Sequence, residues 1–191
     1  MIDGLYIYED FYNNVDEVRD YALGLDFGVS GNYPGVRTSS EPAEQNEYLK
    51  SFFEDNIVKQ KITGWGEGYN TAYQYTTNES TTWIHHDDTK WAGVLYLTPN
   101  APVESGTSLY QHKDTGIFLW DHVRDSESDL NSLDECNDLD KWDEIAFVGN
   151  KYNRLVVYRG GYYHRSKLPG FGTDKYSGRL FQTFFFDTQE D

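Results

Sequence analysis

The first third of the chain changes from alternating to helical spacing of its apolar residues. Residues 5–11 alternate apolar and polar side chains, which predicts a short β-strand. Asn14, with Glu17 three residues later, has the pattern of a helix N-terminus closed by a capping box. A second helix is predicted from about Pro42. Its apolar side chains at helical spacing, typical of core packing, are Tyr48, Leu49, Phe52, Phe53, Ile57 and Val58.

From Gly64 onward the pattern consists of short aromatic and β-branched segments separated by turn residues. Such segments are typical of strands. The predicted strands cover residues 69–76, 83–87, 91–97, 107–112, 153–158 and 179–187. Two early helices followed by many short strands favour a closed or double-sheet β architecture with the helices packed on one side.

The segment 113–144 interrupts this pattern and is rich in acidic residues. It also contains the apolar run 117–120, so it is not expected to be wholly disordered. We predict an insertion folded over the sheet, with some helix. Because the chain has no internal repeat and no linker, residues 1–191 are predicted to form a single domain. In it, residues 1–63 supply a strand and supporting helices, and residues 64–191 supply the β core.

Charge and composition narrow the classes of partner. The chain carries 32 acidic and 16 basic residues, a formal net charge of −16. This balance argues against a broad electrostatic grip on nucleic acid or an anionic membrane, and it favours a neutral or cationic substrate. The single cysteine, Cys136, excludes an internal disulfide and a cysteine-based zinc site. With no signal-peptide pattern and no apolar run of membrane-spanning length, a cytoplasmic location is predicted.

Candidate metal chemistry is concentrated in residues 83–88, which contain two overlapping His-x-Asp triplets. Side chains two residues apart on a strand point to the same face, so one His and one Asp can reach the same ion. Two histidines and one carboxylate on one face of the metal are the ligand set of non-haem iron(II) oxygenases. The best candidate for the third ligand is His164. Either triplet fits, and we favour His85/Asp87 over His86/Asp88.

Arg179 is a second unusual position, because it lies in an otherwise apolar final strand. A buried arginine requires an anionic partner. That partner is either an internal carboxylate or a bound dicarboxylate held by two hydrogen bonds.

With these residues in place, the stretch from about Tyr69 to Asp187 resembles the non-haem iron(II), 2-oxoglutarate-dependent dioxygenases, especially the prolyl-4-hydroxylase-like branch. The residues that carry the resemblance are Tyr75, His85, Asp87, Tyr96, Gly106, Thr107, His164, Arg179 and Thr183. The aromatic-x-His-x-Asp pattern that begins at Trp83 supports the His85/Asp87 frame. The resemblance implies an α+β, mainly β fold: a double-stranded β-helix (jelly-roll) core with the N-terminal helices packed on one sheet.

The resemblance also implies roles for these residues. Iron(II) would be bound by His85, Asp87 and His164. The residues that would hold 2-oxoglutarate are Arg179, Tyr96, Thr183 and Tyr75. The implied activity is an O₂-dependent hydroxylation that converts 2-oxoglutarate to succinate and CO₂. Because Asp87 would supply a carboxylate to the iron, no iron position is left for chloride, and hydroxylation is expected rather than halogenation.

The chain departs from the family in the long gap between His164 and Arg179. Residues 166–174 are predicted to form a mobile loop beside the site, where Lys167 could assist or replace Arg179.

The prime substrate is left open between a peptidyl proline, a free amino acid and another small molecule. Candidate substrate-binding residues are Arg37, Arg159 and Trp91, for which a surface loop arginine, a strand-end salt bridge and core packing are the structural alternatives. Neither nucleic acid nor a membrane is an expected partner, and the pattern selects no oligomeric state. Two other functions are weighed against the hydroxylase. One is a cupin-like metal-dependent enzyme that uses no 2-oxoglutarate, and the other is a non-catalytic jelly-roll binding protein.

Overall fold

Two antiparallel β-sheets form the centre of the protein in the computed structural model, which describes residues 2–66, 69–122, 124–126 and 128–189. The major sheet has the order β1-β8-β5-β10-β4-β2, with β3 also paired to β10. Its strands are β1 (Leu5–Tyr8), β2 (Val36–Arg37), β3 (Ile62–Trp65), β4 (Tyr73–Thr76), β5 (Trp91–Tyr96), β8 (Leu155–Arg159) and β10 (Arg179–Thr188). The minor sheet has the order β7-β6-β9, with β6 (Thr107–His112), β7 (Trp142–Val148) and β9 (His164–Ser166).

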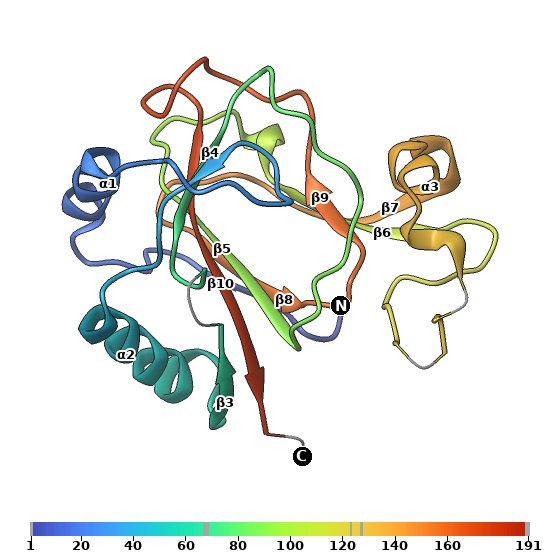
Figure 1. The fold of residues 1–191 in the computed structure, drawn as a ribbon, viewed down its shortest axis with the longest axis horizontal. Coiled ribbons are helices and arrows are strands. Elements are labelled where there is room, and N and C mark those ends of the chain that lie inside the picture. Colours follow the sequence, from blue (N-terminus) through green and yellow to red (C-terminus); the bar gives the residue numbers. More distant parts are fainter. Residues whose placement is uncertain (1, 67–68, 123, 127, 190–191) are drawn as a thin grey trace.

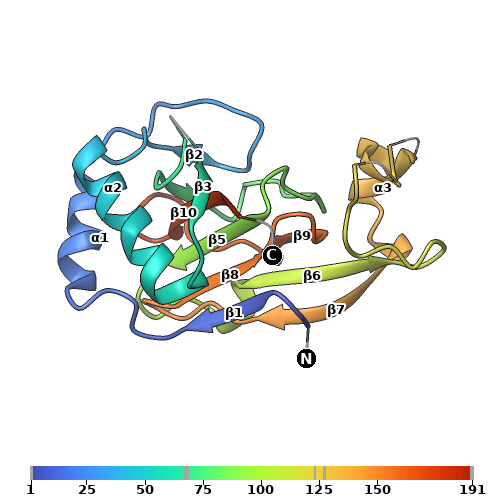
Figure 2. The ribbon, with the colours of Figure 1, turned by 90° about the horizontal axis from the view of Figure 1, so that it is seen from below.

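Two helices, α1 (Val15–Gly24) and α2 (Ala43–Phe52), lie together against one face of the major sheet (Figures 1 and 2). A π-helical turn, Phe53–Val58, continues α2. The predicted capping box of α1 is not formed, because the Asn14 amide donates to the Glu17 carboxylate at 2.9 Å and caps no backbone N–H. Among the helices of the described residues, none is both long and apolar enough to cross a membrane.

The central strand β10 divides its side chains between two environments. Leu180, Phe184 and Phe186 are fully buried in the apolar core beneath the helices. Arg179, Phe181, Thr183 and Phe185 point to the opposite face and line a cavity. This alternation follows from the pleat of a β-strand. One strand therefore supplies both the main core and the wall of a pocket.

The segment 113–144 extends from the end of β6 and returns as β7. It contains α3 (Leu133–Asn137) and two short 3₁₀ turns, Asp129–Asn131 and Leu139–Lys141. Figure 1 shows α3 on the far side of the minor sheet from α1 and α2. This segment covers a small core of Ile84, Tyr110, Leu130, Trp142 and Tyr163.

The fold is mainly β with few helices, as predicted, and both sheets are antiparallel. Strands coincide closely with the predictions at 91–97, 107–112, 153–158 and 179–187. The predicted strand 69–76 is shortened to β4, because Thr71 has a φ of 62°, which is not strand geometry. The predicted strand 83–87 is wrong: the segment is extended but forms only an isolated bridge between His85 and His164. The strands β2, β3, β7 and β9 were not predicted.

Candidate metal and ligand site

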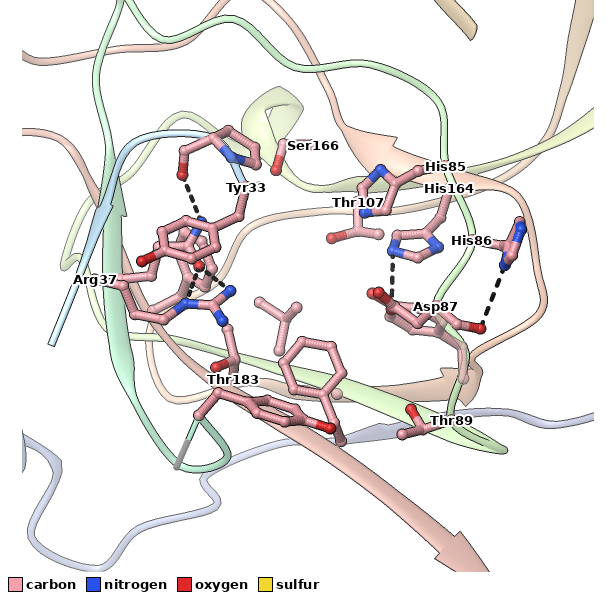
Figure 3. A pocket seen from close by; sticks show the side chains of 18 of the residues that line it. Tyr33, Arg37, His85, His86, Asp87, Thr89, Thr107, His164, Ser166 and Thr183 are labelled. Atoms are coloured by element: carbon pink, nitrogen blue, oxygen red, sulfur yellow. Dashed lines mark hydrogen bonds and ion pairs between the residues drawn. The ribbon is translucent and has the colours of Figure 1, made fainter. Parts of the chain in front are cut away.

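Side chains from two segments that are far apart in the sequence converge beside the major sheet: His85 and Asp87 from one, and His164 from the other (Figure 3). One potential ligand atom from each lies within 4.8 Å of the others. Reciprocal backbone hydrogen bonds hold the segments together: the His85 N–H donates to the His164 carbonyl at 3.0 Å, and the His164 N–H donates to the His85 carbonyl at 2.7 Å. This bridge places both imidazoles side by side even though residues 83–87 form no strand.

The hydrogen bonds of the two imidazoles leave one nitrogen of each available for a metal. His85 Nδ1 lies 3.0 Å from the Trp83 carbonyl, and His164 Nδ1 lies 2.8 Å from the Tyr162 carbonyl. Because a carbonyl oxygen only accepts, both Nδ1 atoms carry the proton and both Nε2 atoms carry a lone pair. A hydrogen bond to the non-ligating nitrogen is the usual way in which a protein orients a metal-binding histidine.

Electrostatics in this cluster favour a bound cation. Burial and the neighbouring His85 hold the pKa of His164 well below its usual range, so its imidazole is neutral. Burial raises the pKa of the Asp87 carboxyl. His164 Nε2 lies 3.4 Å from Asp87 Oδ2, but a neutral imidazole does not compensate the carboxylate charge. A divalent cation would offset the cost of burying the Asp87 carboxylate. A donor set of two imidazole nitrogens and one carboxylate oxygen suits iron(II).

The second triplet is directed elsewhere. The His86 ring stacks on Trp120 with a centroid separation of 4.8 Å and an interplanar angle of 10°. The Asp88 side chain is 85% exposed. The structure thus brings His85 and Asp87, and not His86 and Asp88, to the third histidine. Successive side chains of residues 85–88 thus point to alternate sides, as on a strand, although the segment forms only an isolated bridge.

These three residues lie in the wall of a cavity of about 360 Å³ between the two sheets. This volume is near the low end of the range for small-molecule sites. In Figure 3 the metal-binding group, His85, Asp87 and His164, lies on one side of the cavity, and Tyr33 and Arg37 lie on the other. Thr107, Ser166 and Thr183 also line it.

Arg179 lines the same cavity and is buried with no carboxylate partner among the residues that the structure describes. Its guanidinium donates to the hydroxyl of Ser166 and, at 3.3 Å, to that of Thr107. Those two residues form a cross-strand pair of β9 and β6. The Arg179 Nε atom is buried and has no hydrogen-bond partner. Of the two alternatives raised by the sequence, the internal salt bridge is therefore not found.

The other three predicted 2-oxoglutarate residues differ in position. Thr183 lines the cavity, and its hydroxyl donates to the Ala72 carbonyl at 3.2 Å. Tyr96 is fully buried behind Thr107, with 2.8 Å between the two hydroxyl oxygens. Tyr75 is not brought to the cavity: its ring packs edge-on against Phe27 beneath the helices, at 5.1 Å. On β4 it is the neighbouring residue, Gln74, that faces the cavity, because successive strand side chains alternate.

The predicted substrate-binding residues also differ in their position relative to the cavity. Arg37 lines the cavity. Arg159 instead pairs with Asp3 at 3.1 Å and covers the ring of Trp91 at 5.4 Å. The Trp91 indole belongs to the core beneath the helices and donates to Thr188 at 3.2 Å. Neither residue lines this cavity, which agrees with their structural interpretations. Lys167 pairs with Glu144 at 2.7 Å, not with a group in this cavity.

Sequence reasoning missed several cavity residues: Gln74, Tyr158 and Ser166. The Tyr158 ring lies 4.7 Å from that of His164, and burial together with the charge of Asp87 raises the pKa of its phenol well above the usual range. Tyr158 lies on the predicted strand 153–158, so its strand was available from the sequence although the cavity-lining face was not. Ser166 offered no such signal, because β9 has only three residues.

The fold is similar to that of solved iron- and 2-oxoglutarate-dependent oxygenases. HygX from Streptomyces hygroscopicus, solved with nickel, 2-oxoglutarate and hygromycin B, is 14% identical with a TM-score of 0.58, over 96% of this chain and 82% of that chain. A Trichoplax adhaerens prolyl hydroxylase, solved with a hypoxia-inducible-factor peptide, is 14% identical with a TM-score of 0.58, over 96% and 83%. SnoN, a non-haem α-ketoglutarate-dependent epimerase from nogalamycin biosynthesis, is 12% identical with a TM-score of 0.56, over 96% and 78%.

At these identities the likeness shows a shared fold. By sequence, residues 3–186 match a family described as a family of unknown function, DUF6445, and the chain belongs to that family. No curated protein matches the chain. Since hydroxylases and an epimerase share this fold, the fold alone does not define the reaction, which depends on the site.

Proposed function

We propose that this protein is an Fe(II)- and 2-oxoglutarate-dependent oxygenase that hydroxylates its substrate. The observation that carries the proposal is the convergence of His85, Asp87 and His164 in the same cavity as Arg179, which has no carboxylate partner among the described residues. The shared fold supports it. The proposal includes a single domain over residues 1–191, with a jelly-roll core in residues 64–191.

In this proposal iron(II) is held by the Nε2 atoms of His85 and His164 and by the carboxylate of Asp87. Their fit rests on the two Nδ1–carbonyl hydrogen bonds and on the half-buried Asp87 carboxylate, whose pKa is raised by burial. When bound, iron(II) with 2-oxoglutarate and O₂ supplies the oxidation, and 2-oxoglutarate leaves as succinate and CO₂. The protein contributes position, charge and exclusion of water.

Arg179 would pair with the carboxylate of 2-oxoglutarate that lies away from the metal. Its orphaned Nε is a donor already desolvated and in need of an acceptor. The hydroxyls of Thr107 and Ser166 orient the guanidinium, and Tyr96 positions Thr107 from behind. Thr183 adds a hydroxyl to the cavity floor. A guanidinium oriented before binding loses little further entropy when it pairs with a carboxylate.

The ligand set also bears on the type of reaction. Because Asp87 supplies a carboxylate to the metal, a halide has no vacant position beside both histidines and 2-oxoglutarate. We therefore expect hydroxylation, with a product distribution that does not change when chloride is added. Chlorinated product would contradict this part of the proposal.

The test is an anaerobic titration with iron(II) followed by 2-oxoglutarate, in which the visible charge-transfer band of the chelate is measured. We expect the band in the native protein and its loss in His164→Ala. His122→Ala is the matched control, since it removes an exposed imidazole that does not line the cavity, and it should keep the band. Tight iron binding without the band would favour the cupin-like enzyme that uses no 2-oxoglutarate. Absence of iron binding would overturn the proposal.

A further inference from the structure

A second arginine, Arg37, is buried in the cavity wall with only 8% of its surface exposed. Its Nε and Nη2 atoms both donate to the amide oxygen of Gln74, at 2.9 and 2.6 Å. Its guanidinium lies 3.9 Å from the centroid of the Tyr33 ring. Within the described part of the chain no carboxylate pairs with it. Its close partners are thus a neutral amide and an aromatic ring, and Asp87 acts on its charge only from a distance.

The backbone around Arg37 is built to hold it in this place. Gly35 has a φ of +75°, and a Cβ there would lie 2.0 Å from the Tyr75 carbonyl oxygen, so only glycine allows the turn to approach β4 this closely. Arg37 then pairs with Gln74 in the β2–β4 ladder. The Gln74 amide nitrogen donates to the Pro34 carbonyl at 2.6 Å, which fixes the amide whose oxygen holds the arginine. Such a constrained cation is pre-organised for a ligand.

Arg37 and the metal-binding group lie on opposite sides of the same cavity (Figure 3). Asp87 does not serve as its ion-pair partner, because no hydrogen bond or salt bridge joins the two side chains, and Asp87 is directed to the two histidines. The rings of Tyr69 and Phe185, whose centroids are 5.7 Å apart, also line the cavity, and the Phe185 centroid lies 5.8 Å from the Arg37 guanidinium.

We propose that Arg37 binds a carboxylate of the prime substrate, and that this substrate is a small free carboxylic acid. Its carboxylate pairs with Arg37, and its carbon frame extends over the aromatic wall toward His85, Asp87 and His164. This inference rests on the proposed oxygenase function. It leaves Arg179 to 2-oxoglutarate and gives each of the two cavity arginines one anion.

The cavity and the overall charge favour a small acid over an acidic peptide. A volume of about 360 Å³ is small for a site that must also admit 2-oxoglutarate. A net charge of −16 repels a polyanion during approach, whereas one carboxylate at contact distance is governed by the nearby guanidinium. Net charge predicted a neutral or cationic substrate. The guanidinium inside the cavity instead favours a substrate with one carboxylate.

The test compares benzoate with benzamide, which have nearly the same shape but differ in charge. Binding is followed by saturation-transfer NMR, on the protein alone and again with zinc(II) and saturating 2-oxoglutarate. Under both conditions benzoate should bind at least about tenfold more tightly than benzamide, because only the anion forms a charge-assisted pair. With zinc(II) and saturating 2-oxoglutarate, so that Arg179 is occupied, Arg37→Met should remove this preference. Arg159→Met, a matched loss of one cation outside the cavity, should keep it.

A second variant tests the same point without removing the arginine. Gln74→Glu places a carboxylate next to Arg37 and should abolish the preference for benzoate in a protein whose circular dichroism is native. Equal binding of benzoate and benzamide to the native protein would overturn the inference. So would a preference that survives in both Arg37→Met and Gln74→Glu.

One further comparison addresses the size of the substrate. A capped tripeptide, acetyl-Ala-Glu-Ala-amide, should not displace benzoate at equal concentration, and displacement would overturn the restriction to small free acids. These readouts require neither iron nor turnover. Loss of the chelate band with an intact benzoate preference would defeat the oxygenase proposal, whereas the reverse result would defeat only the inference about Arg37.

Discussion

The two faces of the major sheet hold opposite kinds of side chain, although the same strands supply both. On the helix-facing side, Leu180, Phe184 and Phe186 of β10 are fully buried among other apolar groups. On the cavity-facing side, Arg179 has a buried nitrogen without a hydrogen-bond partner, and Arg37 of β2 has no carboxylate partner among the described residues. The first face stabilises the fold. The second buries charged groups without carboxylate partners, which lowers stability and is typical of a binding site.

Because side chains alternate along a strand, stability and ligand binding depend on different residues. A substitution on one face should therefore leave the function of the other face unchanged. The following variants test that separation, from the largest expected effect to the smallest.

Phe184→Ala should cause the largest change, a loss of about 3–5 kcal/mol in the free energy of unfolding, because it leaves a cavity in the closed core. Phe184 is fully buried and packs on Phe53, with ring centroids 4.7 Å apart. Urea denaturation measures the loss. The iron and 2-oxoglutarate affinities of the molecules that remain folded should stay within about twofold of the native values, since no cavity-lining group has changed. A large drop in those affinities would show that the faces are coupled.

Arg179→Met should produce the reverse result. The 2-oxoglutarate affinity should fall about 10- to 100-fold, as expected when one partner of a charge-assisted bidentate pair is lost. The free energy of unfolding should fall by less than about 1 kcal/mol, because the substitution also removes an unsatisfied buried nitrogen. Calorimetric titration and urea denaturation give the two values. Unchanged 2-oxoglutarate affinity would count against the assignment of Arg179.

Asp87→Asn should stabilise the metal-free protein by about 1 kcal/mol at neutral pH while abolishing iron binding. Burial raises the pKa of Asp87, so the folded state penalises its charged form. That penalty is absent below the unfolded pKa, about 4, and is complete above the folded pKa. The stability difference between variant and native protein should therefore be near zero at pH 4 and grow as the pH rises. A variant less stable than the native protein at neutral pH would contradict this explanation.

Tyr75→Phe should have the smallest effect, with the 2-oxoglutarate affinity unchanged within about twofold. The family resemblance makes Tyr75 a co-substrate ligand, but in the structure its ring lies on the helix-facing side of β4. The matched substitution on the other side is Gln74→Glu, which should alter anion binding at Arg37. A clear loss of 2-oxoglutarate affinity in Tyr75→Phe would show that the faces are assigned wrongly.

The contrast between Tyr75 and Thr183 shows what the sequence could predict. Thr183 follows Arg179 by four residues on one long strand, so both necessarily share a face. The same logic kept His85 and Asp87 together even where the strand itself failed to form. Tyr75 has no second site residue on its own strand that would indicate which face it occupies. A shift of one residue in register moves a side chain to the opposite face, and register depends on β10, which is more than a hundred residues away.

Pocket partners contributed by short elements could not be predicted for a related reason. β2 has two residues and β9 has three, too few for a periodic signal. Their positions are set by tertiary pairing: Arg37 with Gln74 and Ser166 with Thr107. The sequence did suggest Arg37 as a substrate residue, from its place beside a glycine turn. It could not show that Arg37 is buried opposite the metal-binding group.

The most direct test is a crystal structure of the protein grown without oxygen in the presence of iron(II) and 2-oxoglutarate. We predict iron on His85, Asp87 and His164, the outer carboxylate of 2-oxoglutarate on Arg179, and Arg37 free for a second anion. Iron bound by His86 and Asp88, or 2-oxoglutarate paired with Arg37 instead of Arg179, would contradict this account.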